Sequence, residues 1–73
     1  MNMLLVESQN FAAIGYEEGT LYVRFKSGDL HSYLMVPEDI YRSLLWADSK
    51  DDYFHENIEG QYDEVGDGSH HHH

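Results

Sequence analysis

The amino-acid sequence predicts an α+β fold in which an antiparallel β-meander of three to four strands is followed by a two-helix hairpin that covers one face of the sheet. Residues 20–26 alternate between apolar and polar side chains, which is the period of a half-buried strand. Residues 36–49 instead carry apolar side chains at helical spacing behind a proline. Only short turn segments separate the predicted strands, so neighbouring strands are expected to pair antiparallel.

The predicted strands occupy the first half of the chain. They are a short edge or lead-in strand and three longer ones, at 3–6, 11–16, 20–26 and 30–36. The connections are rich in turn-forming residues and lie at 8–10, 17–19 and 27–29. Gly15 lies inside the second strand, where a glycine indicates a bulge or a close backbone approach.

Alternation along each strand assigns its side chains to one of two sheet faces. The face beneath the helices is expected to carry Ile14, Tyr16, Leu21, Val23, Phe25, His31 and Tyr33. The opposite, open face is expected to carry Tyr22, Arg24 and Lys26, with Leu34 and Phe11 beside them.

The first predicted helix begins at Pro37, because proline suits a position whose N–H would be unpaired. Its apolar stripe consists of Ile40, Tyr41, Leu44 and Leu45. Ser49 is the predicted N-cap of a second helix, and Gly60 is expected to end that helix. The aromatic residues at core spacing are predicted to be buried, and they are Tyr16, Tyr33, Tyr41, Trp46 and Phe54.

The chain is predicted to form a single domain over residues 1–62. Residues 63–73 are interpreted as an acidic, disordered tail. Its last six residues, 68–73, have the composition of a purification tag and are excluded from functional reasoning.

The formal net charge is −10, and most of it lies in the second half of the chain. Residues 37–73 contain ten carboxylates against two basic residues, a net of −8. Such a field repels phosphate backbones and anionic lipid. The sequence has no cysteine, no signal peptide pattern and no apolar run near the ~18 residues of a membrane span. We therefore expect a cytoplasmic protein that does not bind membranes, as a monomer or weak homodimer.

The sequence resembles the KTSC domain family over residues 6–62. The matching segments are Asn10-x3-Ile14-Gly15-Tyr16, Leu21-x-Val23-x-Phe25-x2-Gly28, Tyr33-x2-Val36-Pro37-x3-Tyr41, Ala47-x-Ser49 and Tyr53-Phe54-x3-Ile58. The family is named for a C-terminal extension of lysyl-tRNA synthetase and also occurs as small free-standing bacterial and phage proteins.

The resemblance implies the fold but supplies no catalytic or binding residues. The synthetase association points to RNA only by analogy. Two positions depart from the family pattern. His31 stands where an aromatic such as tyrosine is usual, and Lys50-Asp51-Asp52 stands where a glycine often follows the serine.

The sequence carries no motif that indicates catalysis, a metal or a cofactor. His55-Glu56-Asn57-Ile58-Glu59 resembles the zinc motif H-E-x-x-H but ends in glutamate, so only two ligands would share one helical face. His31 has no recognisable nucleophile motif beside it and is interpreted as filling an aromatic position. We therefore expect a protein that is not an enzyme and needs neither metal nor cofactor.

The favoured hypothesis is a protein-interaction module that uses its open sheet face or its acidic helical surface. The candidate binding residues are Tyr22, Arg24, Lys26 and Leu34. Because aromatic and basic residues coincide at Tyr22, Arg24 and Lys26, binding of nucleic acid, RNA in particular, is the alternative. A further alternative is that the acidic surface mimics nucleic acid.

Overall fold

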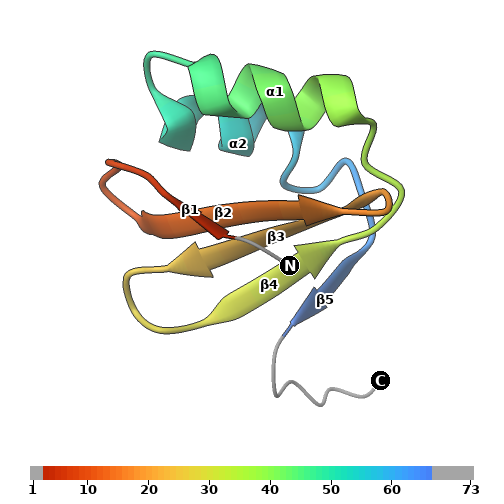
Figure 1. Cartoon of the computed structure of the whole chain (residues 1–73), viewed down its shortest axis with the longest axis horizontal. Helices are drawn as coiled ribbons and strands as arrows, with labels where there is room; N and C mark the ends of the chain where they lie inside the picture. The colour runs from red at the N-terminus through yellow and green to blue at the C-terminus, as the bar shows by residue number, and fades with distance from the viewer. Residues whose placement is uncertain (1–2, 67–73) are drawn as a thin grey trace.

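The computed structural model describes residues 3–66 and has the predicted α+β architecture, with two helices on one side of an antiparallel sheet (Figure 1). The elements are β1 (Met3–Leu5), β2 (Phe11–Glu17), β3 (Thr20–Phe25), β4 (Leu30–Tyr33), α1 (Glu38–Trp46), α2 (Lys50–Asn57) and β5 (Glu64–Gly66). The sheet has five strands in the order β1-β2-β3-β4-β5, one more than the upper limit of the prediction.

The additional strand, β5, comes from the segment interpreted as a disordered tail. Glu64–Gly66 pairs antiparallel with β4, and the Leu34 N–H donates a hydrogen bond to the Asp63 carbonyl at 2.9 Å. A strand of three residues is too short to show a clear alternation, which is why the sequence pattern did not reveal it. The proposed tag at 68–73 lies outside the described residues.

The buried core lies between the sheet and the helices. It consists of Phe11, Ile14, Leu21, Val23, Tyr33, Val36, Leu44, Phe54 and Ile58. The expected pattern on β3 is confirmed, because Leu21 and Val23 are fully buried and Phe25 packs against the core. His31 also lies on this side, with its ring edge-on to that of Phe25 at a centroid distance of 5.1 Å.

Phe11 was predicted on the open face, and this prediction was wrong. The β2–β3 register is irregular between Phe11 and Ala13, where Phe11 pairs with Phe25 and Ala13 with Arg24. The extra residue, Ala12, reverses the alternation and turns the Phe11 side chain into the core. The irregularity therefore falls at Ala12 and not at Gly15, which is buried in regular pairing with Tyr22.

Trp46 was predicted to be buried, and it is instead 85% exposed. It is the last residue of α1, two positions beyond the fully buried Leu44. Two residues correspond to about 200° around a helix, so the Trp46 side chain points away from the sheet.

Tyr16 fixes the connection from β4 to α1. Its hydroxyl donates a hydrogen bond to the Val36 carbonyl at 2.6 Å, and its ring stacks on Tyr41 at 4.9 Å. Met35 adopts a positive φ of 58° just before this contact. The backbone therefore leaves the strand direction early, and β4 ends at Tyr33 instead of Val36.

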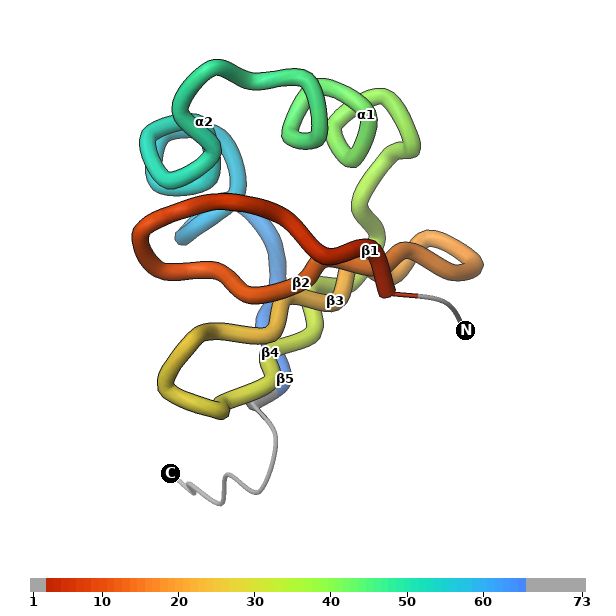
Figure 2. The backbone as a smooth tube through the Cα atoms, turned by 60° about the vertical axis from the view of Figure 1, so that its left-hand side comes forward, coloured from red at the N-terminus to blue at the C-terminus, as the bar shows by residue number. Residues whose placement is uncertain are grey.

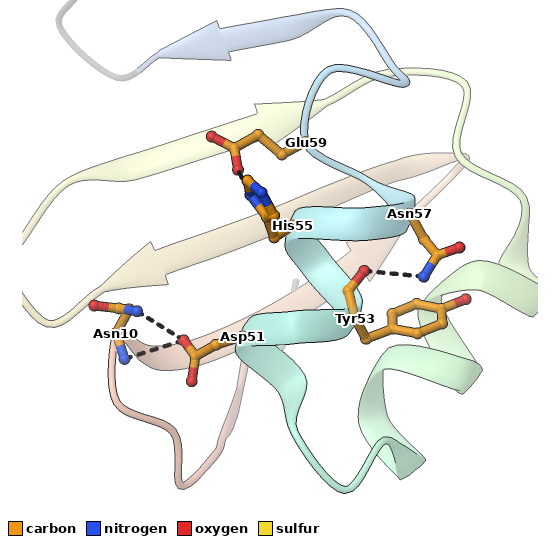
Figure 3. Close-up of polar contacts among 6 residues, drawn as sticks. All are labelled: Asn10, Asp51, Tyr53, His55, Asn57 and Glu59. Carbon is orange, nitrogen blue, oxygen red and sulfur yellow. Dashed lines mark hydrogen bonds and ion pairs between the residues drawn. The ribbon is translucent and has the colours of Figure 1, made fainter.

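The start of α2 is held by two polar side chains. Ser49 is the N-cap as predicted, because its Oγ accepts a hydrogen bond from the Asp52 N–H at 3.3 Å. Asp51 reaches across to the loop between β1 and β2 (Figure 3). It accepts hydrogen bonds from the Ser8 hydroxyl at 2.9 Å, the Gln9 N–H at 3.1 Å and both the N–H and the amide of Asn10.

These bonds change the acidity of Asp51. Partial burial opposes its ionisation, but the hydrogen bonds from Ser8, Asn10 and Gln9 outweigh that effect and lower the pKa of the carboxyl below its ordinary value of 3.8. Asp51 therefore links α2 to the β1–β2 loop most strongly when it is ionised.

We predict that Leu44→Ala lowers the free energy of unfolding by about 2–5 kcal/mol, because it removes a fully buried side chain between helix and sheet. A domain of this size has only roughly 3–5 kcal/mol of net stability, so the variant should be largely unfolded near room temperature. Thermal unfolding followed by circular dichroism measures the effect. A cooperative transition at the wild-type midpoint would show that the assigned packing of α1 is incorrect.

We predict that Asp51→Asn destabilises the fold in a pH-dependent way. The folded-state pKa of Asp51 is depressed, so its contribution is fully present above the ordinary value of 3.8 and is lost as the pH falls through the folded value. Urea unfolding midpoints of wild type and variant should therefore differ at pH 6 and converge in acid. Asp48→Asn, at an exposed site just before the cap, is the control. A gap between wild type and Asp51→Asn that stays constant from pH 6 into acid would contradict the role assigned to the charge.

Candidate functional site

The sheet face opposite the helices is the first candidate site. Both helices lie on the same side of the sheet, and no described element covers the other side (Figure 2). The strand register places its side chains in rows, which comprise Met3, Gly15, Tyr22, Ser32 and Val65 in one row and Leu5, Ala13, Arg24 and Leu30 in the next.

Of the four predicted binding residues, Tyr22 and Arg24 lie on β3, and Lys26 and Leu34 lie just beyond the ends of β3 and β4. Tyr22, half-buried, and Arg24, exposed, are adjacent on the open face of β3. Leu34 follows the end of β4 and is 37% exposed, one row beyond Tyr22. Lys26 is exposed in the turn after β3, where its N–H donates to the Asn10 carbonyl at 2.8 Å. The structure brings Tyr22 and Arg24 together and places the other two beyond the ends of the strands.

The open face is mainly apolar. Leu5 is 87% exposed, Val65 is also exposed, and Leu30 is half-buried. Arg24 supplies the positive charge of the two central rows, and its Nη1 lies 3.5 Å from the Gly28 carbonyl. Such a surface offers van der Waals contact and few phosphate-binding groups.

A second surface, which we call the β1–α1 groove, was missed by the sequence analysis. It has a volume of about 580 Å³ and is lined by Leu4, Leu5, Val6, Glu7, Leu45, Trp46 and Lys50. Trp46 was assigned to the core as one of the aromatic residues at core spacing. Its position off the apolar stripe of the helix was the available signal that it would be exposed.

The strand that borders this groove is also an edge of the sheet. β1 stands first in the strand order and pairs only with β2 in the described chain. Its outer N–H and C=O groups are therefore available to a partner strand. Met3–Leu5 contains no proline or charged residue, the devices that commonly protect an edge.

A third surface, which we call the α2 cleft, lies between α2, the β1–β2 loop with the start of β2, and the ends of β3, β4 and β5. Its volume is about 590 Å³. Two histidine–carboxylate pairs line it. His31 of β4 pairs with Glu64 of the neighbouring strand β5. His55 Nδ1 lies 2.8 Å from Glu59 Oε1, as Figure 3 shows.

The pKa of the Tyr33 hydroxyl is affected by two carboxylates that line the α2 cleft with it. Burial raises this pKa well above the ordinary range, and the negative charges of Glu64 and Glu59 raise it further. The hydroxyl therefore stays protonated, in a region of negative potential.

His55 and Glu59 are the two residues of the H-E-x-x-H-like segment that could bind a metal ion, and they contact each other. The two side chains are one helical turn apart, as the sequence spacing suggested, and both are largely exposed. Within residues 3–66, no group of three histidine or carboxylate side chains is placed to hold a metal ion. In the same range, no helix is long and apolar enough to cross a membrane.

Comparison with known proteins agrees with this fold. The crystal structure of a KTSC domain protein from Yersinia pestis superposes with a TM-score of 0.84 at 28% sequence identity, over 92% of this chain and 97% of that one. An uncharacterized protein of Stutzerimonas stutzeri (strain A1501) is 33% identical over 64 residues, which cover 85% of this chain and 90% of the relative. Neither description names a reaction or a ligand.

The family model of the KTSC domain matches residues 7–62, which include every segment on which the sequence resemblance rests. This match spans β2 to α2, and the Yersinia structure extends the likeness over nearly the whole chain. The chain therefore belongs to the KTSC domain family.

Proposed function

We propose that this protein is a non-enzymatic module that binds another protein through the apolar surface running from the β1–α1 groove, across β1, onto the open sheet face. The observation that carries the proposal is the exposure of Trp46 and Leu5, 85% and 87%, at one groove. Large apolar side chains that gather in one place on a small protein typically mark an interface. Tryptophan is also among the residues that contribute most to binding energy.

Leu5 joins the two parts of this surface. It lines the β1–α1 groove, and its register with Ala13 places it in the same row as Arg24 on the open face. A partner that pairs with the β1 edge would therefore contact the groove on one side and the open face on the other. Main-chain pairing would supply affinity, and the two surfaces would supply specificity.

The residues of the KTSC resemblance support a non-catalytic role, because several have structural contacts. Asn10 donates two hydrogen bonds to Asp51. Tyr16 donates to the Val36 carbonyl, and Ser49 caps α2. These contacts give Asn10, Tyr16 and Ser49 a structural role that does not require chemistry on a substrate.

We predict that a protein partner is captured by the wild type and lost when the β1 surface is altered. Trp46→Ala with Leu5→Ser removes the two exposed apolar anchors, and Tyr22→Ser with Arg24→Ser alters the open face without emptying the core. Each pair should reduce capture from a lysate of the encoding organism by roughly tenfold or more. Mass spectrometry with and without nuclease identifies the partner and shows whether nucleic acid mediates the contact.

Arg42→Ala is the matched control for this capture, because Arg42 is an exposed α1 residue whose contact is a surface ion pair with Glu38 at 3.1 Å. It should retain the partner. Thermal unfolding must show that every variant is folded. A partner that remains bound to both double variants would contradict the proposed surface, and loss of the partner upon nuclease treatment would favour the nucleic-acid alternative.

We predict weak binding to free DNA or RNA at physiological salt. Arg24 and Lys26 are the basic residues predicted on the open face, so the salt dependence should correspond to at most about two released ions. Stacking on Tyr22 would add about 1–3 kcal/mol, too little alone for micromolar affinity. Titration of labelled single-stranded RNA and duplex DNA at low and physiological salt tests this. A dissociation constant at or below about 1 μM at physiological salt would overturn the prediction.

A further inference from the structure

The α2 cleft is a second concave surface, with a strongly one-sided charge. Five carboxylate residues line it: Asp29, Asp51, Asp52, Glu59 and Glu64. Its lining contains no lysine or arginine. A cleft lined by one sign of charge focuses the electrostatic field and raises the local concentration of counter-charged ligands.

The floor of this cleft is aromatic. Phe25, Tyr33 and Phe54 line it, and Phe54 packs edge-on against both of the other rings at 6.1 and 5.4 Å. Tyr33 and Phe54 are buried and Phe25 is half-buried, so the half-buried ring is the one that could contact the apolar stem of an organic cation, and the carboxylates supply the main attraction. A phosphate or a carboxylate ligand would be repelled from the same site.

Within the described residues, no lysine or arginine forms an ion pair with a carboxylate of the cleft. Asp51 is engaged by neutral donors only, namely Ser8, Gln9 and Asn10. Asp29 accepts a bond from the neutral Ser27 hydroxyl at 3.3 Å. Glu59 and Glu64 contact histidines, which offset a charge only when they are protonated.

We propose that the α2 cleft binds a lysine or arginine side chain presented by an extended basic segment of a partner protein. Charge complementarity argues for the cation, because a net charge of −10 attracts basic segments over the whole molecule and the cleft concentrates that attraction. The position of the cleft argues for a peptide, because it is bordered by Glu64 of β5, the last strand in the sheet order. An extended segment can pair with this edge and direct a basic side chain into the cleft.

This site is separate from the β1 surface. The α2 cleft and the β1–α1 groove share no lining residue. The cleft reaches the β1–β2 loop at Gln9 and Asn10, but the carboxylates tested below belong to the β3–β4 turn and to the segment after α2. Either proposal can therefore fail while the other holds.

The test is titration of the isotope-labelled full chain, at pH 8 and low salt, with an end-blocked peptide of alternating arginine and valine. The largest amide shifts should fall at Asp29, His31, Glu59 and Glu64. The same peptide with citrulline in place of arginine keeps the shape and the hydrogen-bonding groups but has no charge, and it should bind at least about tenfold more weakly. Equal binding of the two peptides would overturn the proposal.

Variants that remove equal charge at different places distinguish binding in the α2 cleft from a general attraction of the peptide to the acidic protein. Asp29→Asn with Glu59→Gln removes two charges from the cleft and should weaken the arginine peptide about tenfold. Glu17→Gln with Glu18→Gln removes two charges from the exposed β2–β3 turn and should change affinity by less than about threefold, since exposed distant charges are screened. Equal losses from both pairs would overturn the proposal in favour of a diffuse acidic field.

Two further measurements test whether the ligand is a peptide and whether its site is independent of the β1 surface. Spermidine, a free amine without a peptide backbone, should bind more weakly than the arginine peptide, and tighter binding of spermidine would overturn the assignment to a peptide. The Trp46→Ala and Leu5→Ser variant should bind the arginine peptide as the wild type does. Loss of peptide binding in this variant would show that the peptide occupies the β1 surface instead of the α2 cleft.

Discussion

The packing of Phe54 onto the sheet is the contact on which the rest of the structure depends. Its ring meets those of Phe11 and Tyr33 edge-to-face at 4.9 and 5.4 Å, an arrangement that aromatic quadrupoles favour. The helix that carries it has only eight residues, and a helix of that length is not stable in water alone. Tertiary contacts therefore hold α2 in place, through Phe54 and Ile58 below and through Asp51 at its start.

Covering only one face of the sheet has direct consequences for what the protein presents to its surroundings. Two short helices cannot enclose five strands, so the opposite face stays open, and the outer edges of β1 and β5 stay unpaired in the described chain. The same geometry leaves α1 with its last residue, Trp46, beyond the sheet contact and beside β1. The candidate surfaces are thus exposed because a small domain has too few elements to cover both faces and both edges of its sheet.

Local patterns in the sequence were sufficient to predict the fold class. They did not reveal contacts between residues that are far apart in the chain. Alternation around Val23 and the cap at Ser49 are properties of neighbouring residues, so the meander and the helix hairpin followed from them. The inward turn of Phe11 depends on an extra residue in one strand, and β5 depends on pairing with a strand 30 residues earlier. Asp51 shows the same limit, because its partners lie more than 40 positions away. The open face could be named from alternation, whereas both clefts required the positions of the helices.

The two concave surfaces differ in the polarity of the side chains that line them. The β1 end carries exposed leucines and a tryptophan, and its groove is lined by a single carboxylate and a single lysine. The β5 end is lined by carboxylates and histidines. Four strand spacings of about 4.8 Å, roughly 19 Å, separate the two edges. A partner strand at one edge would therefore leave the other free, so the two proposed sites are compatible with simultaneous occupation. Two segments of one partner would then bind more tightly than either alone, because the second contact becomes intramolecular.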